Sequence, residues 1–245
     1  MNFSKVLCAT DNFIFKISKE RKYEGSFSSA DLPEGFTVTC HAGAYHTKAN
    51  SLESVEAAVN NGAKVIEFDV SFRPDGTPVI IHDSSPKANE GVLFSEAVDI
   101  IAKTDECLIN LDIKSTANLA AVDEIIRKKG LFDRVFYTGV FADWVDAVKS
   151  SSSIPYYLNH PISDTEASDE AAAQAVADKA KSLGAFGINS NFRNATPLFV
   201  EKMRENDLLV SLWTVNNAHD MVRVLKLRPD NITTKKPHLM KAIVR

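Results

Sequence analysis

From residue 36 onward, short apolar runs alternate with longer amphipathic stretches along the chain. The short runs are rich in β-branched and aromatic residues, which is typical of β-strands. The longer stretches repeat apolar residues at three- and four-residue spacing, as Leu52, Val55 and Val59 do, which is typical of helices with one buried face. We predict strands at residues 36–41, 64–70, 77–82, 107–114, 134–138, 154–159, 185–189, 208–214 and 230–233. We predict helices at residues 51–61, 94–103, 119–129, 144–150, 165–183, 197–205 and 218–226.

The order of these elements predicts an α/β fold with parallel strands. Strands separated by helices need crossover connections, and crossovers make successive strands parallel. Eight to nine strand candidates are enough to close a single (β/α)8 TIM barrel, and 245 residues is a usual length for one. The competing fold is an open doubly wound sheet. No glycine-rich phosphate loop follows the first strand, and polar strand ends occur along the whole chain, so the barrel is favoured.

Residues 1–35 do not follow this alternation and form a predicted N-terminal extension to the barrel of residues 36–245. Phe13, Phe15 and Ile17 alternate with polar neighbours, which indicates a short strand or an extended arm, and residues 18–23 are rich in charge. We expect the extension to pack across the bottom of the barrel, because a terminal segment must be held down to be ordered. The alternative is an arm that contacts a second copy of the chain in a homo-oligomer.

Acidic side chains stand at the ends of two predicted strands. Residues two apart in a strand project from the same face, so Glu67 and Asp69 point together, as do Asp112 and Lys114. The carboxyl ends of barrel strands form the mouth where reactions take place. Three carboxylates there would raise one another's pKa, and a divalent cation would remove the repulsion. Their all-oxygen donor set favours Mg²⁺ or Ca²⁺ over zinc. The plainer alternative is that each acid is solvated or salt-bridged, as most are.

Two histidines also stand at predicted strand ends: His41 is the last residue of the first strand and His82 the last residue of the third. A single histidine beside apolar residues is more often structural, but two near a metal site are candidates for a general acid and base pair. Lys114 faces the same way as Asp112, and a lysine directed into a barrel needs an anionic partner. Its partner is either a carboxylate, Asp112 or Glu67, or a phosphoryl oxygen of the substrate. The whole set of residues favours the phosphoryl group.

Four further residues have less specific signals. Trp213, near the end of the eighth predicted strand, either lines the substrate pocket or fills the barrel. Asn50 precedes the first helix, where it is either a cap or loop residue or a polar group that contacts substrate. His46 lies in the first loop after a strand, where substrate contacts are made in such barrels. Asp83 faces away from His82 and is expected either to be structural or to orient a neighbouring loop.

Charge and composition exclude several other functions. The net charge of −4 does not suit nucleic-acid binding, so an anionic substrate must be attracted by local positive charge. No stretch approaches the ~18 apolar residues of a membrane span, so no stable membrane insertion is expected. The apolar run at residues 6–10 is too short for a signal peptide, and we expect a cytoplasmic protein. Three cysteines without metal-ligand spacing are expected to be reduced and mostly buried.

Seven short motifs occur in order between residues 36 and 240: His41-Ala-Gly, Asn50-Ser-Leu-Glu, Glu67-Phe-Asp, Asp75-Gly-Thr-Pro-Val-Ile-Ile-His-Asp83, Leu111-Asp-Ile-Lys114, Trp213-Thr-Val-Asn216 and Ile232-Thr-Thr-Lys-Lys-Pro237. Each alone is weak, but together they resemble the glycerophosphodiester phosphodiesterase family. The resemblance implies a TIM barrel in which His41 and His82 act as general acid and base. It implies that Lys114 contacts the phosphate and that a divalent ion is held by Glu67, Asp69 and Asp112.

The activity implied by the resemblance is metal-dependent hydrolysis of a small-molecule glycerophosphodiester to glycerol 3-phosphate and an alcohol. Some features depart from the family's pattern. Ala42 replaces an arginine and cannot make its bidentate phosphate contact. Ala49 replaces a carboxylate, and Asp112 stands where glutamate is usual, which shortens one metal-binding side chain. About thirty residues separate Asp83 from Lys114, too few for an inserted domain, so an open mouth is expected.

Three other functions stay open. A related phospholipase D-like enzyme would cleave lysophospholipid or sphingolipid head groups, and would need a long apolar groove in the loops after the strands. A non-catalytic barrel that binds a metal and an anion is consistent with the two alanines, although both histidines are present. A metal-dependent aldolase would use carboxylates, but would not need paired histidines at strand ends.

Overall fold

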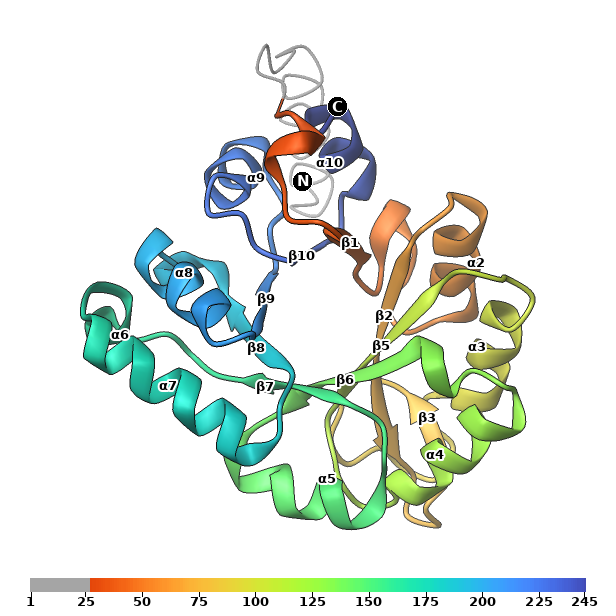
Figure 1. Cartoon of the computed structure of the whole chain (residues 1–245). Coiled ribbons are helices and arrows are strands. Elements are labelled where there is room, and N and C mark those ends of the chain that lie inside the picture. The colour runs from red at the N-terminus through yellow and green to blue at the C-terminus, as the bar shows by residue number, and fades with distance from the viewer. Residues whose placement is uncertain (1–26) are drawn as a thin grey trace, which may run out of the picture.

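Eight parallel strands close into a barrel in the computed structural model, which describes residues 27–245 of the chain (Figure 1). These strands are β1 (Thr37–Cys40), β2 (Val65–Phe72), β5 (Leu108–Ile113), β6 (Val135–Val140), β7 (Tyr156–Asn159), β8 (Gly187–Asn191), β9 (Leu209–Trp213) and β10 (Asn231–Thr234). Their order around the barrel is β1-β10-β9-β8-β7-β6-β5-β2, and the pairing of β1 with β2 closes the ring. The predicted (β/α)8 TIM barrel is confirmed.

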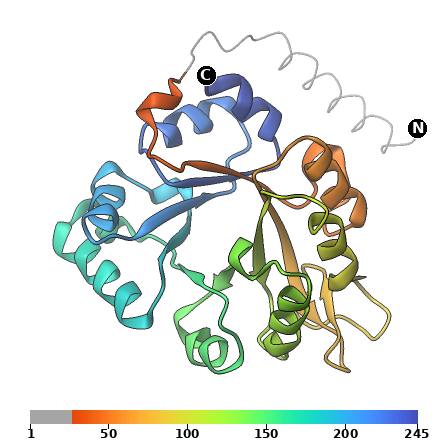
Figure 2. The ribbon, with the colours of Figure 1, turned by 45° about the vertical axis from the view of Figure 1, so that its right-hand side comes forward.

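Helices surround the barrel on its outside (Figure 2). They are α2 (Leu52–Asn60), α3 (Phe94–Ile101), α4 (Leu119–Lys128), α5 (Val145–Ser151), α6 (Asp164–Ser168), α7 (Glu170–Leu183), α8 (Pro197–Glu205), α9 (Ala218–Leu225) and α10 (Pro237–Ile243). Local signals set several of their ends. Ser51 caps α2 by accepting from the Ser54 amide, and Thr196 caps α8 directly before Pro197. Gly184 ends α7 with a φ of +84°, a conformation that suits glycine.

Successive side chains of β2 point alternately toward the surrounding helices and into the barrel interior. Phe68 packs outward against Phe94 of α3, with ring centroids 6.1 Å apart, and both side chains are buried. Burying a side chain of this size contributes about 2 kcal/mol. Glu67 and Asp69, the neighbours of Phe68 in sequence, face the interior. One strand therefore stabilises the fold with one face and carries acidic groups on the other.

The strand predicted at residues 77–82 is not part of the barrel wall. It forms β3 (Pro78–Ile80), which runs antiparallel to the end of β2 and pairs on its other side with β4 (Val92–Leu93). The connection contains a tight turn at residues 73–76, in which the Gly76 amide donates to the carbonyl of Arg73 at 2.8 Å, and so short a connection joins antiparallel strands only. The prediction of a barrel strand was therefore wrong here. His82 follows a hairpin strand instead of a barrel strand.

Two helices also differ from the prediction. The single helix predicted over residues 165–183 is divided into α6 and α7 at Asp169, whose backbone is extended. The Asp169 side chain accepts from the Ala172 amide and so caps α7. Helix α10 was not predicted, although Pro237 marks its first turn.

The described part of the N-terminal extension packs against the end of the chain. The Phe27 amide donates to the carbonyl of Ile243 at 2.8 Å, and the Ser29 amide donates to that of Arg245 at 2.8 Å. The predictions for Phe13, Phe15, Ile17 and the charged residues 18–23 lie outside the described residues. Packing of residues 1–35 across the barrel bottom therefore stays a prediction.

Aromatic side chains fill the barrel at the amino ends of its strands. The Tyr157 and Phe186 ring centroids are 4.3 Å apart, and Phe136 lies 5.6 Å from the first and 6.1 Å from the second. A Cβ on Gly187 would lie 2.6 Å from the Tyr157 ring, so glycine is required beside this cluster. A recess of about 310 Å³ lies at this end, and it shares no lining residue with the cavity at the opposite end.

Candidate active site

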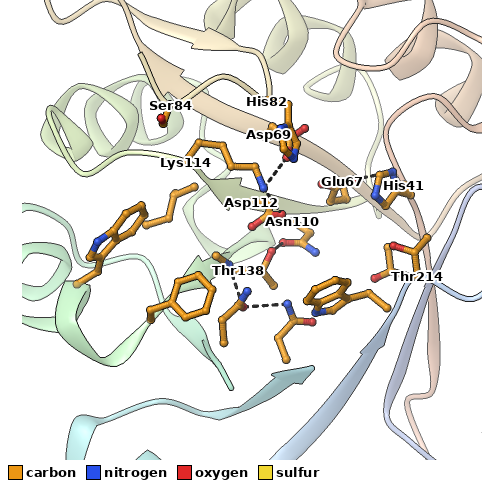
Figure 3. Close-up of a pocket in the computed structure, with 18 of the residues that line it drawn as sticks. His41, Glu67, Asp69, His82, Ser84, Asn110, Asp112, Lys114, Thr138 and Thr214 are labelled. Carbon is orange, nitrogen blue, oxygen red and sulfur yellow. Dashed lines mark hydrogen bonds and ion pairs between the residues drawn. The ribbon is translucent and has the colours of Figure 1, made fainter. Parts of the chain in front are cut away.

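A cavity of about 610 Å³ opens at the carboxyl ends of the barrel strands (Figure 3). All eight barrel strands, or the residues directly after them, contribute to its lining. The structure brings to this cavity seven of the eight residues predicted for the site, namely His41, Glu67, Asp69, His82, Asp112, Lys114 and Trp213. Asn50 does not line it.

The three predicted carboxylates form one cluster. Glu67 and Asp69 project from β2, and Asp112 projects from β5, where it is the register partner of Asp69. One carboxylate oxygen from each residue lies within 4.8 Å of the other two. Oδ1 of Asp112 is buried and has no hydrogen-bond partner among the described residues. A compact all-oxygen cluster with a bare buried oxygen has the chemistry that a hard divalent cation requires.

Burial and mutual repulsion disfavour the charged forms of these acids. Burial raises the pKa of Glu67 well above its usual range, and the charges of Asp69 and Asp112 raise it further. Burial also raises the pKa of Asp112, against the opposing effect of Lys114. These directions agree with the repulsion expected from the sequence. In the absence of a cation, the folded protein therefore binds protons at this cluster more tightly than the unfolded chain does.

Lys114 reaches between two of the carboxylates (Figure 3). Its Nζ lies 2.9 Å from Oδ1 of Asp69 and 2.8 Å from Oδ2 of Asp112. Burial acts to lower the pKa of Lys114, but Asp112 and Asp69 together raise it above its usual value. The sequence left Asp112 or Glu67 as its acidic partner, whereas the structure pairs it with Asp112 and Asp69. An ammonium group has three donors, so these two pairs leave one for another acceptor.

His41 follows β1 and lies beside Glu67. Its Nδ1 is 2.9 Å from the carbonyl oxygen of Ala42 and 3.6 Å from Oε2 of Glu67. Because a carbonyl oxygen can only accept, the proton belongs on Nδ1 and Nε2 is the basic nitrogen. Burial lowers the pKa of His41, and the charge of Lys235 contributes in the same direction. The imidazole of His41 is therefore neutral at pH 7.

His82 reaches the cavity from the hairpin and is exposed at the mouth. The amide of Ile81 donates to the carbonyl of Asp69 at 3.1 Å, which holds this segment against β2. Asp83 accepts from the amide of Ser85 at 2.9 Å and does not line the cavity. Asp83 thus shapes the loop after His82, in agreement with the structural role expected for it.

Asn50 holds one of the carboxylates in place. Its side-chain amide donates to Oδ2 of Asp69 at 2.6 Å, and its Oδ1 accepts from the backbone amide of Asp69 at 3.0 Å. Its φ of +55° lies in the left-handed region, which asparagine tolerates better than most residues. The cap of α2 is the next residue, Ser51. In this structure Asn50 orients Asp69 and neither caps the helix nor lines the cavity.

Carboxamide and hydroxyl side chains line the cavity below the carboxylates, and none of them was predicted. The Thr138 hydroxyl donates to Oδ1 of Asn110 at 2.8 Å. Oδ1 of Asn159 accepts from the side chain of Asn189 and from the amide of Gly139, both at 2.9 Å. The alternation along each strand places these residues inside the barrel. Their residue types are too common at strand ends to indicate a site on their own.

Gly139 lies directly against the carboxylate cluster. Its φ is +77°, and a Cβ at this position would overlap Oδ1 of Asp112 and the carbonyl oxygen of Ile113. The register between β6 and β7 is irregular here, between Tyr137 and Val140. Glycine at this position therefore leaves the room that Asp112 occupies.

Three aromatic side chains also line the cavity: Phe141, Trp144 and Trp213. Phe141 and Trp144 meet edge to face with ring centroids 6.5 Å apart, and Phe141 is 45% exposed. Trp213 lines the pocket, which was one of the two alternatives open from the sequence. His46 is not among the lining residues.

Two predictions from composition, on the cysteines and on membrane insertion, can be compared with the structure. Cys40 and Cys107 are buried free thiols, and burial raises their pKa to about 12 and about 11. They are therefore protonated at pH 7, whereas Cys8 lies outside the described residues. Of the helices in residues 27–245, none is both long enough and apolar enough to cross a membrane.

The sequence matches the profile of the Glycerophosphoryl diester phosphodiesterase family at residues 41–116 and 108–239. A curated relative is the glycerophosphodiester phosphodiesterase of Caldanaerobacter subterraneus subsp. tengcongensis. It is 23% identical over 236 residues, which cover 85% of this chain and 97% of the relative.

Solved structures of phosphodiesterases share the fold. One is an Oleispira antarctica phosphodiesterase in complex with the product sn-glycerol-3-phosphate, with a TM-score of 0.71 and 18% identity over 89% of this chain and 99% of that one. Another is a glycerophosphodiester phosphodiesterase from Parabacteroides distasonis, with a TM-score of 0.65 and 18% identity over 85% of this chain and 97% of that one. The family match includes every residue that lines the cavity. The chain therefore belongs to the glycerophosphoryl diester phosphodiesterase family and is a phosphodiesterase-type hydrolase.

Proposed function

We propose that this protein hydrolyses glycerophosphodiesters to glycerol 3-phosphate and an alcohol, with a divalent cation and two histidines at the barrel mouth. The observation that carries the proposal is the grouping in one cavity of three close carboxylates, a lysine and two histidines. Family membership supports a phosphodiester as the substrate. The sn-glycerol-3-phosphate bound to the Oleispira antarctica structure supports glycerol 3-phosphate as the product here.

The cation, Mg²⁺ or Ca²⁺, would be held by Glu67, Asp69 and Asp112. The bare Oδ1 of Asp112 and the oxygen-only donor set support this assignment. When bound, such an ion polarises a phosphoryl oxygen and neutralises the charge that develops in the transition state. Asn50 keeps Asp69 oriented for this role through its two hydrogen bonds.

We assign the general base to His41 and the general acid to His82. His41 is neutral at pH 7 with Nε2 as its basic nitrogen, so it accepts a proton from the attacking oxygen of water or of a substrate hydroxyl. A new phosphorus–oxygen bond forms as the bond to the departing alcohol breaks. His82 donates a proton to that departing oxygen. The remaining donor of Lys114 binds a phosphoryl oxygen beside the cation site.

The polar lower lining supports a hydroxylated group in the depth of the cavity. Asn110, Asn159 and Asn189 present carboxamides there, and an acyl chain packed against them would leave their remaining hydrogen-bonding groups without partners, which is unfavourable. The aromatic side chains near the mouth suit the apolar surface of a leaving group. We propose that the glycerol hydroxyls lie in the polar depth of the cavity and that the variable alcohol lies near the aromatic side chains of the mouth.

The test is hydrolysis of a panel of glycerophosphodiesters with choline, ethanolamine, glycerol and inositol head groups, with a lysophospholipid as the lipid comparison. Each is assayed with Mg²⁺, with Ca²⁺ and with a chelator. We expect His82→Ala to lower kcat by about 10²–10⁴-fold and the chelator to remove activity. His219→Ala is the matched control, because His219 is 89% exposed on α9 outside the cavity. Absence of hydrolysis with both ions would refute the proposed activity, and full activity in chelator would refute the metal.

A further inference from the structure

Lys235 lines the cavity, yet neither the predicted site nor the proposed chemistry uses it. It follows β10 directly, whereas Lys114 follows β5. Strands β1 and β2 lie between β10 and β5 in the barrel. The two lysines therefore approach the cavity from different strands, with the strands that carry His41 and two of the carboxylates between them.

The backbone at Lys235 is held in place beside His41. The Lys235 amide donates to Oδ1 of Asn216 at 2.9 Å, and the Thr234 hydroxyl donates to the same oxygen at 3.3 Å. The His41 amide donates to the carbonyl of Thr234 at 3.0 Å. The positive charge of Lys235 is therefore presented from a fixed turn next to a histidine of the site, and not from a loose loop.

The two lysines differ in their partners. Lys114 is paired with two carboxylates, whereas Lys235 has no ion pair with any acidic residue in the range 27–245. The residue after His41 is the uncharged Ala42, so it supplies no positive charge on this side of the mouth. An unpaired ammonium group at the edge of a reaction cavity is available to an anionic ligand.

The charge balance of the cavity supports a role for Lys235 in binding an anionic substrate. With a divalent ion bound, the ion, the three carboxylates and the two lysines sum to one net positive charge, and the proton on the general acid His82 adds a second. A phosphodiester carries one negative charge, so this surplus attracts it to the site. We propose that Lys235 binds a phosphoryl oxygen of the substrate and provides much of the affinity of the site for phosphodiester anions. This inference rests on the proposed function, since it assigns a substrate contact within the same site.

The experiment compares Lys235→Gln and Lys235→Arg with wild type in steady-state hydrolysis of a glycerophosphodiester. A charge-assisted contact made equally in the bound substrate and the transition state affects KM. We expect the glutamine variant to raise KM about tenfold or more with kcat within about threefold of wild type. We expect the arginine variant to retain most of the affinity. The matched control is Lys181→Gln, an exposed lysine on the outer helix α7.

A second measurement does not need activity. Calorimetric titration with sn-glycerol 3-phosphate and with uncharged glycerol, in Mg²⁺ buffer, separates contact with the phosphate from contact with the hydroxyls. We expect Lys235→Gln to weaken the first about tenfold and to leave the second unchanged. A glycerol 3-phosphate affinity within twofold of wild type would overturn the role of Lys235. If Lys235→Gln weakens glycerol 3-phosphate binding about tenfold, as expected, but the wild-type protein hydrolyses no substrate, only the proposed function would be overturned.

Discussion

Substitution of Glu67 by glutamine is predicted to stabilise the cation-free protein while removing its response to metal. Glu67 is 4% exposed, and its carboxylate faces two further acids within the same cluster. Glutamine has nearly the same shape, and its carbonyl oxygen can still accept from the Ala42 amide as Oε2 of Glu67 does at 2.8 Å. The substitution therefore removes a charge and little else.

The expected size follows from the burial of that charge. Relief of a poorly compensated buried charge is worth about 2 kcal/mol. For a chain of 245 residues this corresponds to a rise in melting temperature of about 4–8 °C in chelator. Wild type with a cation at about one hundred times its Kd gains about 2.7 kcal/mol, or about 5–10 °C. The glutamine variant lacks one of the three ligands and should lose most of this gain.

The pH dependence has a definite sign. The folded pKa of Glu67 is raised above its usual value of 4.5, so its protonated form favours the folded state at low pH. That contribution is lost as the pH rises through the folded pKa. In chelator, the advantage of Glu67→Gln over wild type should therefore grow as the pH increases above 4.5.

The assay is thermal unfolding in chelator, in Mg²⁺ and in Ca²⁺, from pH 4.5 to pH 8. Glu201→Gln, an exposed position on α8, controls for the loss of a surface charge. A variant that melts below wild type in chelator and still gains the full metal-induced shift would refute the reasoning. In that case the charge of Glu67 would not be destabilised by Asp69 and Asp112, and Glu67 would not be a metal ligand.

Three other predictions concern the same site. The acid limb of kcat/KM should lie below pH 6.5, because the pKa of His41 is lowered and the base must be neutral; a pH–rate profile with this limb above pH 7 would exclude His41 as the base. Asn50→Gly keeps the left-handed backbone but removes both bonds to Asp69, so calorimetry should show about 10–100-fold weaker Mg²⁺ binding, and unchanged affinity would contradict the orienting role. Gly139→Ala places a Cβ against Asp112 and should lower the free energy of unfolding in urea by about 2 kcal/mol or more. A variant with wild-type stability and activity would show that Asp112 and the backbone at Ile113 can move aside at little cost.

The fold was predictable because each barrel strand is joined to the next barrel strand through a helix. The hairpin of β3 was missed because residues 77–82 form the same kind of short apolar run as a barrel strand does. What decides the pairing is the four-residue turn at residues 73–76, which is too short for a crossover. The division of α6 from α7 depends on the backbone of Asp169, a residue type that also occurs inside helices.

The acidic cluster was predictable because the two-residue spacing of Glu67 and Asp69 places both on one face. The partners of Lys114 were only partly predictable. They depend on the register that sets Asp69 opposite Asp112, and no local pattern encodes a register between strands so far apart in sequence. The carboxamide lining was missed for a related reason: Asn159 and Asn189 become a pair only when β7 and β8 lie side by side.

The aromatic cluster of Tyr157, Phe186 and Phe136 has a kinetic consequence. Because it plugs the barrel at the far end from the reaction cavity, substrate must enter and both products must leave by the same opening. A product that stays bound in the cavity prevents the next substrate molecule from binding. The proposed product, glycerol 3-phosphate, should thus compete with the incoming diester, and the turnover rate should depend on how fast this product leaves through the single opening.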